Sequence, residues 1–232
     1  MNDNRMVWSL TLVSLAACVL HGAMLFTPFN MYLYTSVAKV VLFLSFLLVY
    51  YRVALKEGFV DFLLVRGDRR NIRLSFLLGL GVFLFIWGAF FVLRPLIDSG
   101  LIVDALAANG ITRENFHFVF LYIVVINATL EQVFFRGFIF LTLYRRGFKG
   151  YAYVYSSLLF SLYHVPIIWG GVTWPIMALS VVGLVVAGLI FNFLAVKCKN
   201  LSGSIIVHVS ANFALNTIVL YNLFWVYGGA GM

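Results

Sequence analysis

Apolar residues fill this chain in long blocks, and most polar residues lie in short intervals between those blocks. A helix needs roughly 20 mainly apolar residues to cross the hydrocarbon core of a bilayer. The pattern therefore predicts an all-α polytopic membrane protein that forms a single bundle of about seven transmembrane helices. The expected spans are Met6–Phe26, Leu33–Leu55, Leu74–Ile97, Phe116–Leu143, Tyr151–Trp169, Trp174–Val196 and Gly203–Tyr227.

Composition agrees with this pattern. Of the 232 residues, 63% are hydrophobic, 18% are aromatic and only 10% are charged, and the mean hydropathy is +1.03. These values lie well beyond those of a soluble globular domain. The longest polar interval, Asp98 to Asn115, is expected to form one external loop. Because little chain remains for a soluble domain, residues 1–232 are expected to form one transmembrane domain.

Positive charge is concentrated in three of the intervals between spans. The chain has 16 Lys and Arg against 8 Asp and Glu. In a soluble protein this excess would suggest nucleic acid, but short cytoplasmic loops of membrane proteins collect Lys and Arg. We therefore expect the lipid bilayer and no nucleic acid as partner, an inside N-terminus and, for so short and loop-poor a chain, a bacterial plasma membrane. The basic residues of these loops are Arg52, Lys56, Arg66, Arg69, Arg70, Arg73, Arg145, Arg146, Lys149, Lys197 and Lys199.

The two cysteines are not expected to form a disulfide, because Cys18 lies in the first apolar block and Cys198 lies at the predicted inner surface. The motif LAAC, Leu15 to Cys18, is similar to a lipoprotein cleavage site. Its leader is only weakly charged and the chain stays apolar beyond the cysteine, so the first span is expected to be retained.

Glu131 is the only acidic residue within the seven expected spans. An ionisable residue at membrane depth is costly unless it faces a protein interior or water, and it is a functional hypothesis by default. Two imidazoles, His164 and His208, lie in other spans. These three side chains are therefore candidates for one shared polar site.

Helical spacing indicates which neighbouring polar residues can interact, because positions four apart share a helix face. Gln132 is expected to pair with Arg136 through its amide oxygen, and this leaves Glu131 free to point elsewhere. A carboxylate, two imidazoles and a carboxamide can then converge on a wet pocket, which has the parts for hydrolysis. The pairs that share a face are Gln132 with Arg136, Phe160 with His164, and His208 with Asn212.

Three short motifs carry a family resemblance. They are EQVFFR (Glu131 to Arg136), FSLYH (Phe160 to His164) and HVSAN (His208 to Asn212). In this order they resemble the CAAX protease and bacteriocin-processing (CPBP or ABI) family of glutamic-type intramembrane endopeptidases. The family pattern is Glu-Glu-x-x-x-Arg, Phe-x-x-x-His and His-x-x-x-Asn or a small residue in place of the Asn, and the resemblance covers about residues 127–216.

The resemblance implies a protease that hydrolyses a peptide bond in a membrane-associated peptide or protein, or in a C-terminal tail, without a cofactor. Glu131 and His164 match the residues that activate a water, and His208 and Asn212 match those that stabilise the oxyanion. Both roles are physically reasonable, because a positioned base and preorganised donors act strongly in a site that excludes water. Gln132, Arg136 and Phe160 match supporting positions.

One residue departs from the family pattern, since Gln132 stands where the second glutamate is expected. If that glutamate mainly supports the arginine, glutamine keeps a hydrogen bond and activity survives. If it takes part in proton transfer, the chain is impaired, and a non-catalytic immunity or scaffold protein derived from the same family becomes the alternative function.

Other interpretations of the polar residues stay open. Glu131, His164 and His208 can hydrogen-bond to one another as interhelical contacts, or they can hold zinc with an open position for water. No His-Glu-x-x-His helix accompanies them. Lys39 is expected to extend toward the outer headgroups. The remaining polar residues that we assign to packing or to the interface are His21, His117, Asn192 and Asn216.

Overall fold

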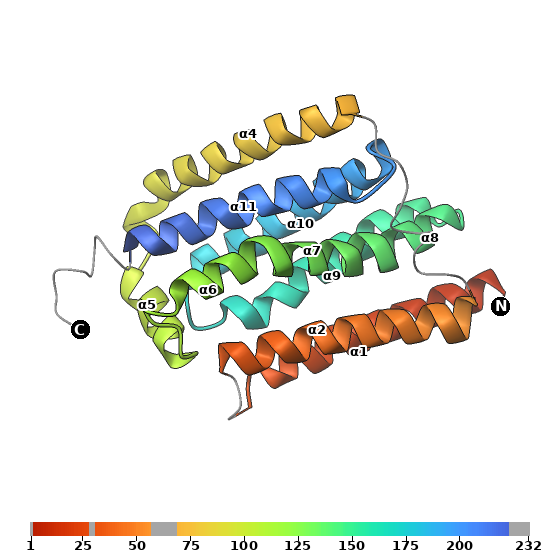
Figure 1. Ribbon diagram of the computed structural model, residues 1–232, viewed down its shortest axis with the longest axis horizontal. Helices are drawn as coiled ribbons and strands as arrows, with labels where there is room; N and C mark the ends of the chain where they lie inside the picture. The colour runs from red at the N-terminus through yellow and green to blue at the C-terminus, as the bar shows by residue number, and fades with distance from the viewer. Residues whose placement is uncertain (1, 28–30, 57–68, 223–232) are drawn as a thin grey trace.

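The computed structural model describes residues 2–27, 31–56 and 69–222, and no strand occurs among them. The prediction of an all-α membrane bundle is confirmed. Figure 1 shows long helices that run side by side along one axis. The elements are α1 (Asp3–Met24), α2 (Tyr32–Tyr50), η1 (Tyr51–Leu55), α4 (Arg69–Leu93), η2 (Arg94–Leu96), α5 (Ser99–Ala108), α6 (Phe116–Leu121), η3 (Tyr122–Asn127), α7 (Ala128–Glu131), η4 (Gln132–Leu141), α8 (Thr142–Arg145), α9 (Lys149–Ile168), α10 (Trp174–Lys197) and α11 (Ser202–Tyr221).

Six helices in the described part of the chain are long and apolar enough to cross a membrane. They correspond to six of the seven expected spans, and α6 to α8 form one of them without interruption. The expected span Tyr151–Trp169 forms α9, which has the same length as α11 but is more polar and is not among the six. Residues 223–227 of the last expected span lie outside the described residues.

The prediction that the interval from Asp98 to Asn115 forms one plain loop is wrong, because this interval contains the ten-residue helix α5. The Asp98 carboxylate accepts from the backbone N–H groups of Gly100 and Leu101 at 2.9 and 3.3 Å. Such an N-cap satisfies donors that have no partner inside the helix. The cap followed by the apolar run LIVDALAA was the signal that the sequence offered for this helix.

The bundle has two ends, and the basic loops gather at one of them (Figure 1). Near the start of α1, Asp3 lies 3.9 Å from Arg146 at the end of α8. At the same end, the side chain of Asn71 donates to the backbone oxygen of Lys197 at 3.2 Å. The predicted inner loops therefore lie together, although Arg66 lies outside the described residues.

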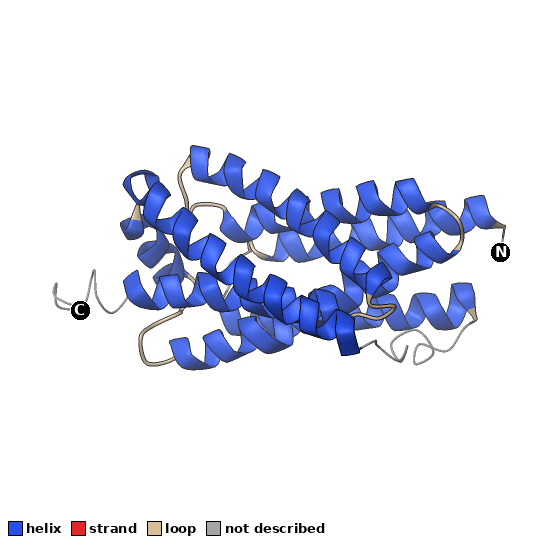
Figure 2. Ribbon diagram, turned by 90° about the horizontal axis from the view of Figure 1, so that it is seen from above, coloured by secondary structure: helices blue, strands red, loops and turns tan. Residues whose placement is uncertain are grey.

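The opposite end is formed by α5 and its neighbours. The backbone N–H of Tyr32 donates to the carbonyl of Asn109 at 3.0 Å, and Thr173 donates to the carbonyl of Leu96 at 3.3 Å. Because α1 starts at the basic end and α11 ends at this one, the start of the first described helix and the end of the last lie on opposite sides of the bundle (Figures 1 and 2).

The centre of the bundle is the helix from α6 to α8. Its middle stretch, η4, is π-helical and is buried almost throughout. The pair α1 and α2 lies on one side of it, while α10, α11 and α4 lie on the other (Figure 1). Its fully buried aromatic residues are Phe134, Phe135, Phe138 and Phe140.

The outer surface is apolar over most of its length. On α4, for example, Phe85 and Val92 are 73% and 78% exposed. Large exposed apolar side chains are a liability in water but match a hydrocarbon environment. The fold is therefore that of an integral membrane protein.

Candidate active site

Glu131 lies at the centre of the bundle, in the short α7 segment between the π-helical stretches η3 and η4, and only 1% of its surface is exposed. π-helical stretches inside an α-helix occur frequently at functional sites. A carboxylate that is removed from solvent needs partners that compensate its charge. The structure supplies them from three other helices.

One carboxylate oxygen of Glu131, Oε1, is held by hydrogen bonds. Lys39 Nζ on α2 and Asn127 Nδ2 on η3 each donate to it at 3.0 Å, and the hydroxyl of Tyr163 on α9 lies at 3.4 Å. The prediction that Lys39 extends toward the headgroups is wrong, since its ammonium is buried and forms an ion pair with Glu131. The cost of leaving a buried carboxylate unpaired favours this inward position.

The other oxygen, Oε2, faces the two histidines. It lies 3.6 Å from His164 Nε2 and 3.7 Å from His208 Nε2, and it accepts no hydrogen bond from the described residues. The three groups that the sequence singled out from separate spans therefore lie together. Because Oε1 takes the fixed contacts, the lone pairs of Oε2 remain available toward the imidazoles.

The two imidazoles are held in opposite tautomers. His164 Nδ1 lies 2.7 Å from the backbone oxygen of Phe160, which can only accept, so Nδ1 carries the proton and Nε2 has the lone pair. His208 Nδ1 lies 2.8 Å from the amide Nε2 of Gln132, which can only donate, so His208 carries its proton on Nε2. The partner of one ring nitrogen thus determines the role of the other. At Oε2, His164 presents an acceptor and His208 presents a donor.

Gln132 and Arg136 do not form the pair that their spacing predicts. Gln132 bonds to His208 instead, and Arg136 NH2 donates to the backbone oxygen of Gly188 at 3.3 Å. The guanidinium lies over the rings of Phe160 and Phe191, at 4.2 and 4.8 Å from their centroids. Aromatic faces attract a cation and accept the planar guanidinium. The arginine therefore supports the site through packing.

Phe160 forms the floor of the site. Its ring lies 4.6 Å from that of His164 and 5.8 Å from that of His208, in both cases edge to face. The predicted pairing of Phe160 with His164 agrees with this geometry. Phe160 therefore contacts both imidazoles and the guanidinium of Arg136.

Asn212 lies on the same helix as His208 but has a different partner. Its amide nitrogen donates to the backbone oxygen of Ile123 at 3.0 Å, and Asn216 in turn donates to the backbone oxygen of Asn212 at 2.8 Å. The carbonyl of Ile123 belongs to the π-helical η3 and also accepts from the backbone N–H of Ala128. Asn212 thus ties α11 to η3 and has no contact with Glu131 or the two histidines among its hydrogen bonds.

Two of the residues that we assigned to packing, His21 and Asn192, lie in contacts between helices. His21 is buried against the ring of Tyr163, with 5.2 Å between centroids. Asn192 on α10 donates to Ser157 on α9 at 3.1 Å. Cys18 and Cys198 are both buried and free.

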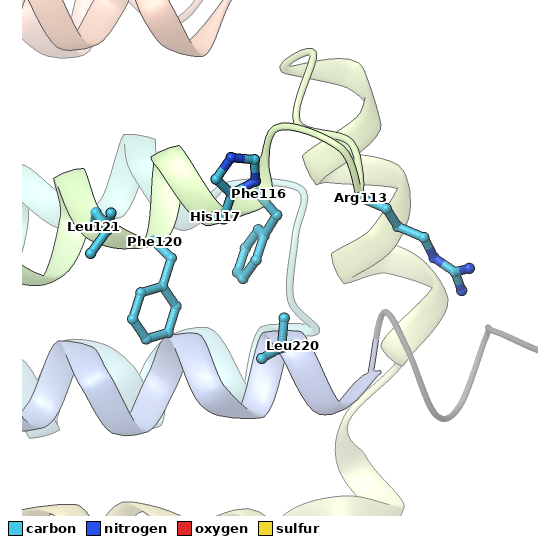
Figure 3. Close-up of a pocket in the computed structure, with 6 residues that line it drawn as sticks. All are labelled: Arg113, Phe116, His117, Phe120, Leu121 and Leu220. Carbon is cyan, nitrogen blue, oxygen red and sulfur yellow. The ribbon is translucent and has the colours of Figure 1, made fainter.

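A separate apolar cavity of about 470 Å³ lies near the α5 end of the bundle (Figure 3). Phe116 and Phe120 point toward Leu220 of α11 across it. Its lining is mostly apolar, and none of its residues is a hydrogen-bond or ion-pair partner of Glu131. The lining residues are Arg113, Phe116, His117, Phe120, Leu121 and Leu220.

No group of three or more His, Cys, Asp and Glu side chains within the described ranges has the geometry of a metal site. The Lys39 ammonium also occupies the position next to Oε1 where a cation would bind Glu131. A donor set with a lysine against its only carboxylate fits zinc poorly. The expectation of a cofactor-free site stays a prediction.

Fold and site together define an integral membrane protein with a buried carboxylate between two imidazoles. Within this class, residues 113–214 match the family model described as type II CAAX prenyl endopeptidase, Rce1-like. The match spans all three motifs, so the predicted resemblance to the CAAX protease family is confirmed. No curated protein and no solved structure matches the chain.

Proposed function

We propose that the chain is an intramembrane endopeptidase that hydrolyses a peptide bond in a membrane-associated protein or C-terminal tail. The observation that carries this proposal is the position of Glu131 Oε2, buried and within 3.7 Å of an imidazole acceptor and an imidazole donor. The match to a protease family supports the same reaction class. The setting that fits the basic loops is a bacterial plasma membrane with the N-terminus inside.

The first chemical step is attack by water. A water held between Glu131 Oε2 and His164 Nε2 loses a proton to this pair as its oxygen bonds to the carbonyl carbon. The His164 side chain is 16% exposed whereas that of Glu131 is 1% exposed, so water and substrate reach Glu131 from the histidine side. The carbonyl oxygen becomes negative as the tetrahedral intermediate forms.

Hydrogen-bond donors on α11 stabilise the negative charge of the carbonyl oxygen. His208 presents an N–H at Nε2, which its hydrogen bond to Gln132 fixes. Asn212 lies one turn further along α11 and donates one of its two amide hydrogens to Ile123, so a contact with the oxyanion would use the other. Donors that are preorganised in a dry site stabilise an oxyanion strongly. The proton held by Glu131 and His164 then passes to the leaving nitrogen as the C–N bond breaks, which regenerates the site.

The test compares wild type, Glu131→Ala and Val125→Ala, purified in the same detergent and incubated with a peptide that ends in a prenylated Cys-aliphatic-aliphatic-X tail. The family description names this substrate class. Val125 is 52% exposed on the same membrane span and serves as the matched control. Mass spectrometry of the products should show cleavage by wild type and Val125→Ala, and a loss of roughly 10²–10⁴-fold with Glu131→Ala, as for a removed general base.

A second arm covers substrates without a prenyl group. The C-termini of membrane proteins are compared in cells that carry wild type or Glu131→Ala at matched expression. Peptides produced only by wild type identify the substrate. Equal product profiles in both arms would overturn the proposal.

Removal of metal ions gives an independent prediction. Because Lys39 fills the cation position at Glu131, the cleavage rate should be unchanged after dialysis against a chelator. A zinc-dependent enzyme would lose activity and regain it on addition of zinc. Such a loss would replace the glutamate-based mechanism with a metal-based one.

The second candidate function is a non-catalytic membrane scaffold or immunity protein, and Gln132 is the observation that favours it, because the family pattern has glutamate there. A scaffold keeps its cellular phenotype in the Glu131→Ala form, whereas a protease loses it. Comparison of the phenotype with the product profile separates the two functions.

A further inference from the structure

We infer that Lys39 of α2 is a positioning residue of the active site that fixes Glu131 through Oε1 and thereby directs Oε2 to the imidazoles. The inference rests on the proposed function. It extends the catalytic unit beyond residues 113–214, the part of the chain that matches the family model.

The position of Lys39 follows from the buried face of α2. Thr35, Lys39, Phe43 and Leu47 follow one another at intervals of four residues and are all buried. Phe43 stacks on Phe134 with 4.0 Å between ring centroids. This packing fixes the rotation of α2 against the central helix, so Lys39 has to point inward at the level of Glu131.

The ammonium group has two firm contacts at the site. It donates to Glu131 Oε1 at 3.0 Å and to the Tyr163 hydroxyl at 2.8 Å, while that hydroxyl is oriented toward the same Oε1 at 3.4 Å. Asn127 completes the arrangement from the side of the central helix. The carboxylate is therefore held on one oxygen by groups from three elements.

The two oxygens of Glu131 consequently have separate tasks. Oε1 receives the cation and the other donors, and Oε2 faces His164 and His208 at 3.6 and 3.7 Å without accepting a hydrogen bond from the described residues. If Lys39 is replaced by an apolar residue, the carboxylate loses its counter-charge in a buried site and is free to rotate. A catalytic group that is displaced by about 1 Å can lose roughly 100-fold in rate.

The test measures kcat and KM for Lys39→Met, Lys39→Arg and Lys197→Met with the peptide that the wild type cleaves. Lys197 is an exposed lysine at the end of α10 and is the matched control. We expect a fall in kcat of roughly 100-fold for Lys39→Met, with KM within about twofold of wild type, because Lys39 acts on Glu131 and not on substrate. Lys39→Arg keeps the cation and should recover most of the lost rate, and Lys197→Met should match wild type.

Thermal unfolding in the same detergent provides a readout that does not require activity. Lys39→Met should lower the melting temperature because it leaves Glu131 buried without its partner. The double variant Lys39→Met with Glu131→Gln removes both charges and should recover most of that loss, as coupled neighbours do.

The outcomes separate this inference from the proposed function. Wild-type kcat in Lys39→Met, or melting effects that simply add in the double variant, would overturn the role of Lys39. Recovery of stability in the double variant, in a protein whose wild type cleaves nothing, would support the Lys39–Glu131 pair while the endopeptidase proposal fails.

Discussion

The hydrogen bond between Gln132 and His208 gives the glutamine a specific task. The amide nitrogen donates to Nδ1 and leaves the proton of the neutral ring on Nε2, which faces Glu131. Without this donor the ring exchanges between its two tautomers, and only one of them presents an N–H to an oxyanion. The residue that departs from the family pattern is therefore compatible with catalysis.

Substitution of Gln132 tests that role. Gln132→Met keeps the size of the side chain but removes the donor, and kcat should fall roughly tenfold, less than the ~10²-fold loss of a direct oxyanion donor. Gln132→Glu should keep or raise kcat, because a carboxylate beside the ring favours its doubly protonated form, which retains the N–H at Nε2. Steady-state kinetics at constant pH measure both effects. Loss of activity in Gln132→Glu with full activity in Gln132→Met would contradict the assigned tautomer.

Glu131, His164 and His208 could be predicted at the residue scale, because each is a rare polar group in an apolar span and the motifs have fixed spacing. Lys39 could not. A lysine at membrane depth can extend to the headgroups or pair with a buried carboxylate, and the choice depends on how α2 is rotated against the central helix. The partners of Gln132 and Arg136 were missed for a similar reason, since residues of α10 and α11 compete with the contact inside their own helix.

At the element scale, the packing of α9 against α10 determines where His164 lies. A Cβ on Gly188 would lie 2.9 Å from the Cα and the Cβ of Ser157, so the two backbones approach as closely as glycine allows. The Gly188 carbonyl also accepts from Arg136, which supports the floor of the site. The close approach of Gly188 and Ser157 therefore connects the packing of α9 on α10 to the geometry of the imidazoles.

Gly188→Ala should separate α9 from α10 and destabilise the protein by about 1–3 kcal/mol, as for an overpacked core. It should also reduce the cleavage rate, because His164 moves with α9. Gly183→Ala on the same helix is the matched control, since a Cβ there meets nothing within 4 Å. Denaturation in detergent and the peptide assay measure both quantities. Equal stability of the two variants would show that the helices can separate without cost.

The long helices could be predicted from hydropathy because the span length is set by the bilayer. Their finer structure could not. The π-helical stretches η3 and η4 leave no mark in the hydrophobic pattern, and α5, with ten residues, is too short for a membrane span, so hydropathy alone does not separate it from a loop. These features depend on tertiary packing and on the Asp98 cap rather than on periodicity.

At the scale of the whole molecule, charge divides the bundle into two ends. Arg146 and Lys197 lie at the end where α1 begins, and α5 lies at the other. From the bias of Lys and Arg toward the cytoplasm we propose that the end where α1 begins faces the cytoplasm. An orientation of this kind also fixes the side from which a substrate tail reaches the site.

Cysteine labelling of intact cells tests this orientation. Asp104 and Lys197 are exposed at opposite ends, and the native Cys18 and Cys198 are buried, so a membrane-impermeant maleimide should react only with an introduced cysteine. Asp104→Cys should be labelled from outside, and Lys197→Cys only after the membrane is permeabilised. The reverse pattern would place the N-terminus outside. It would also show that the packing of the bundle, rather than its loop charges, decides how this chain inserts.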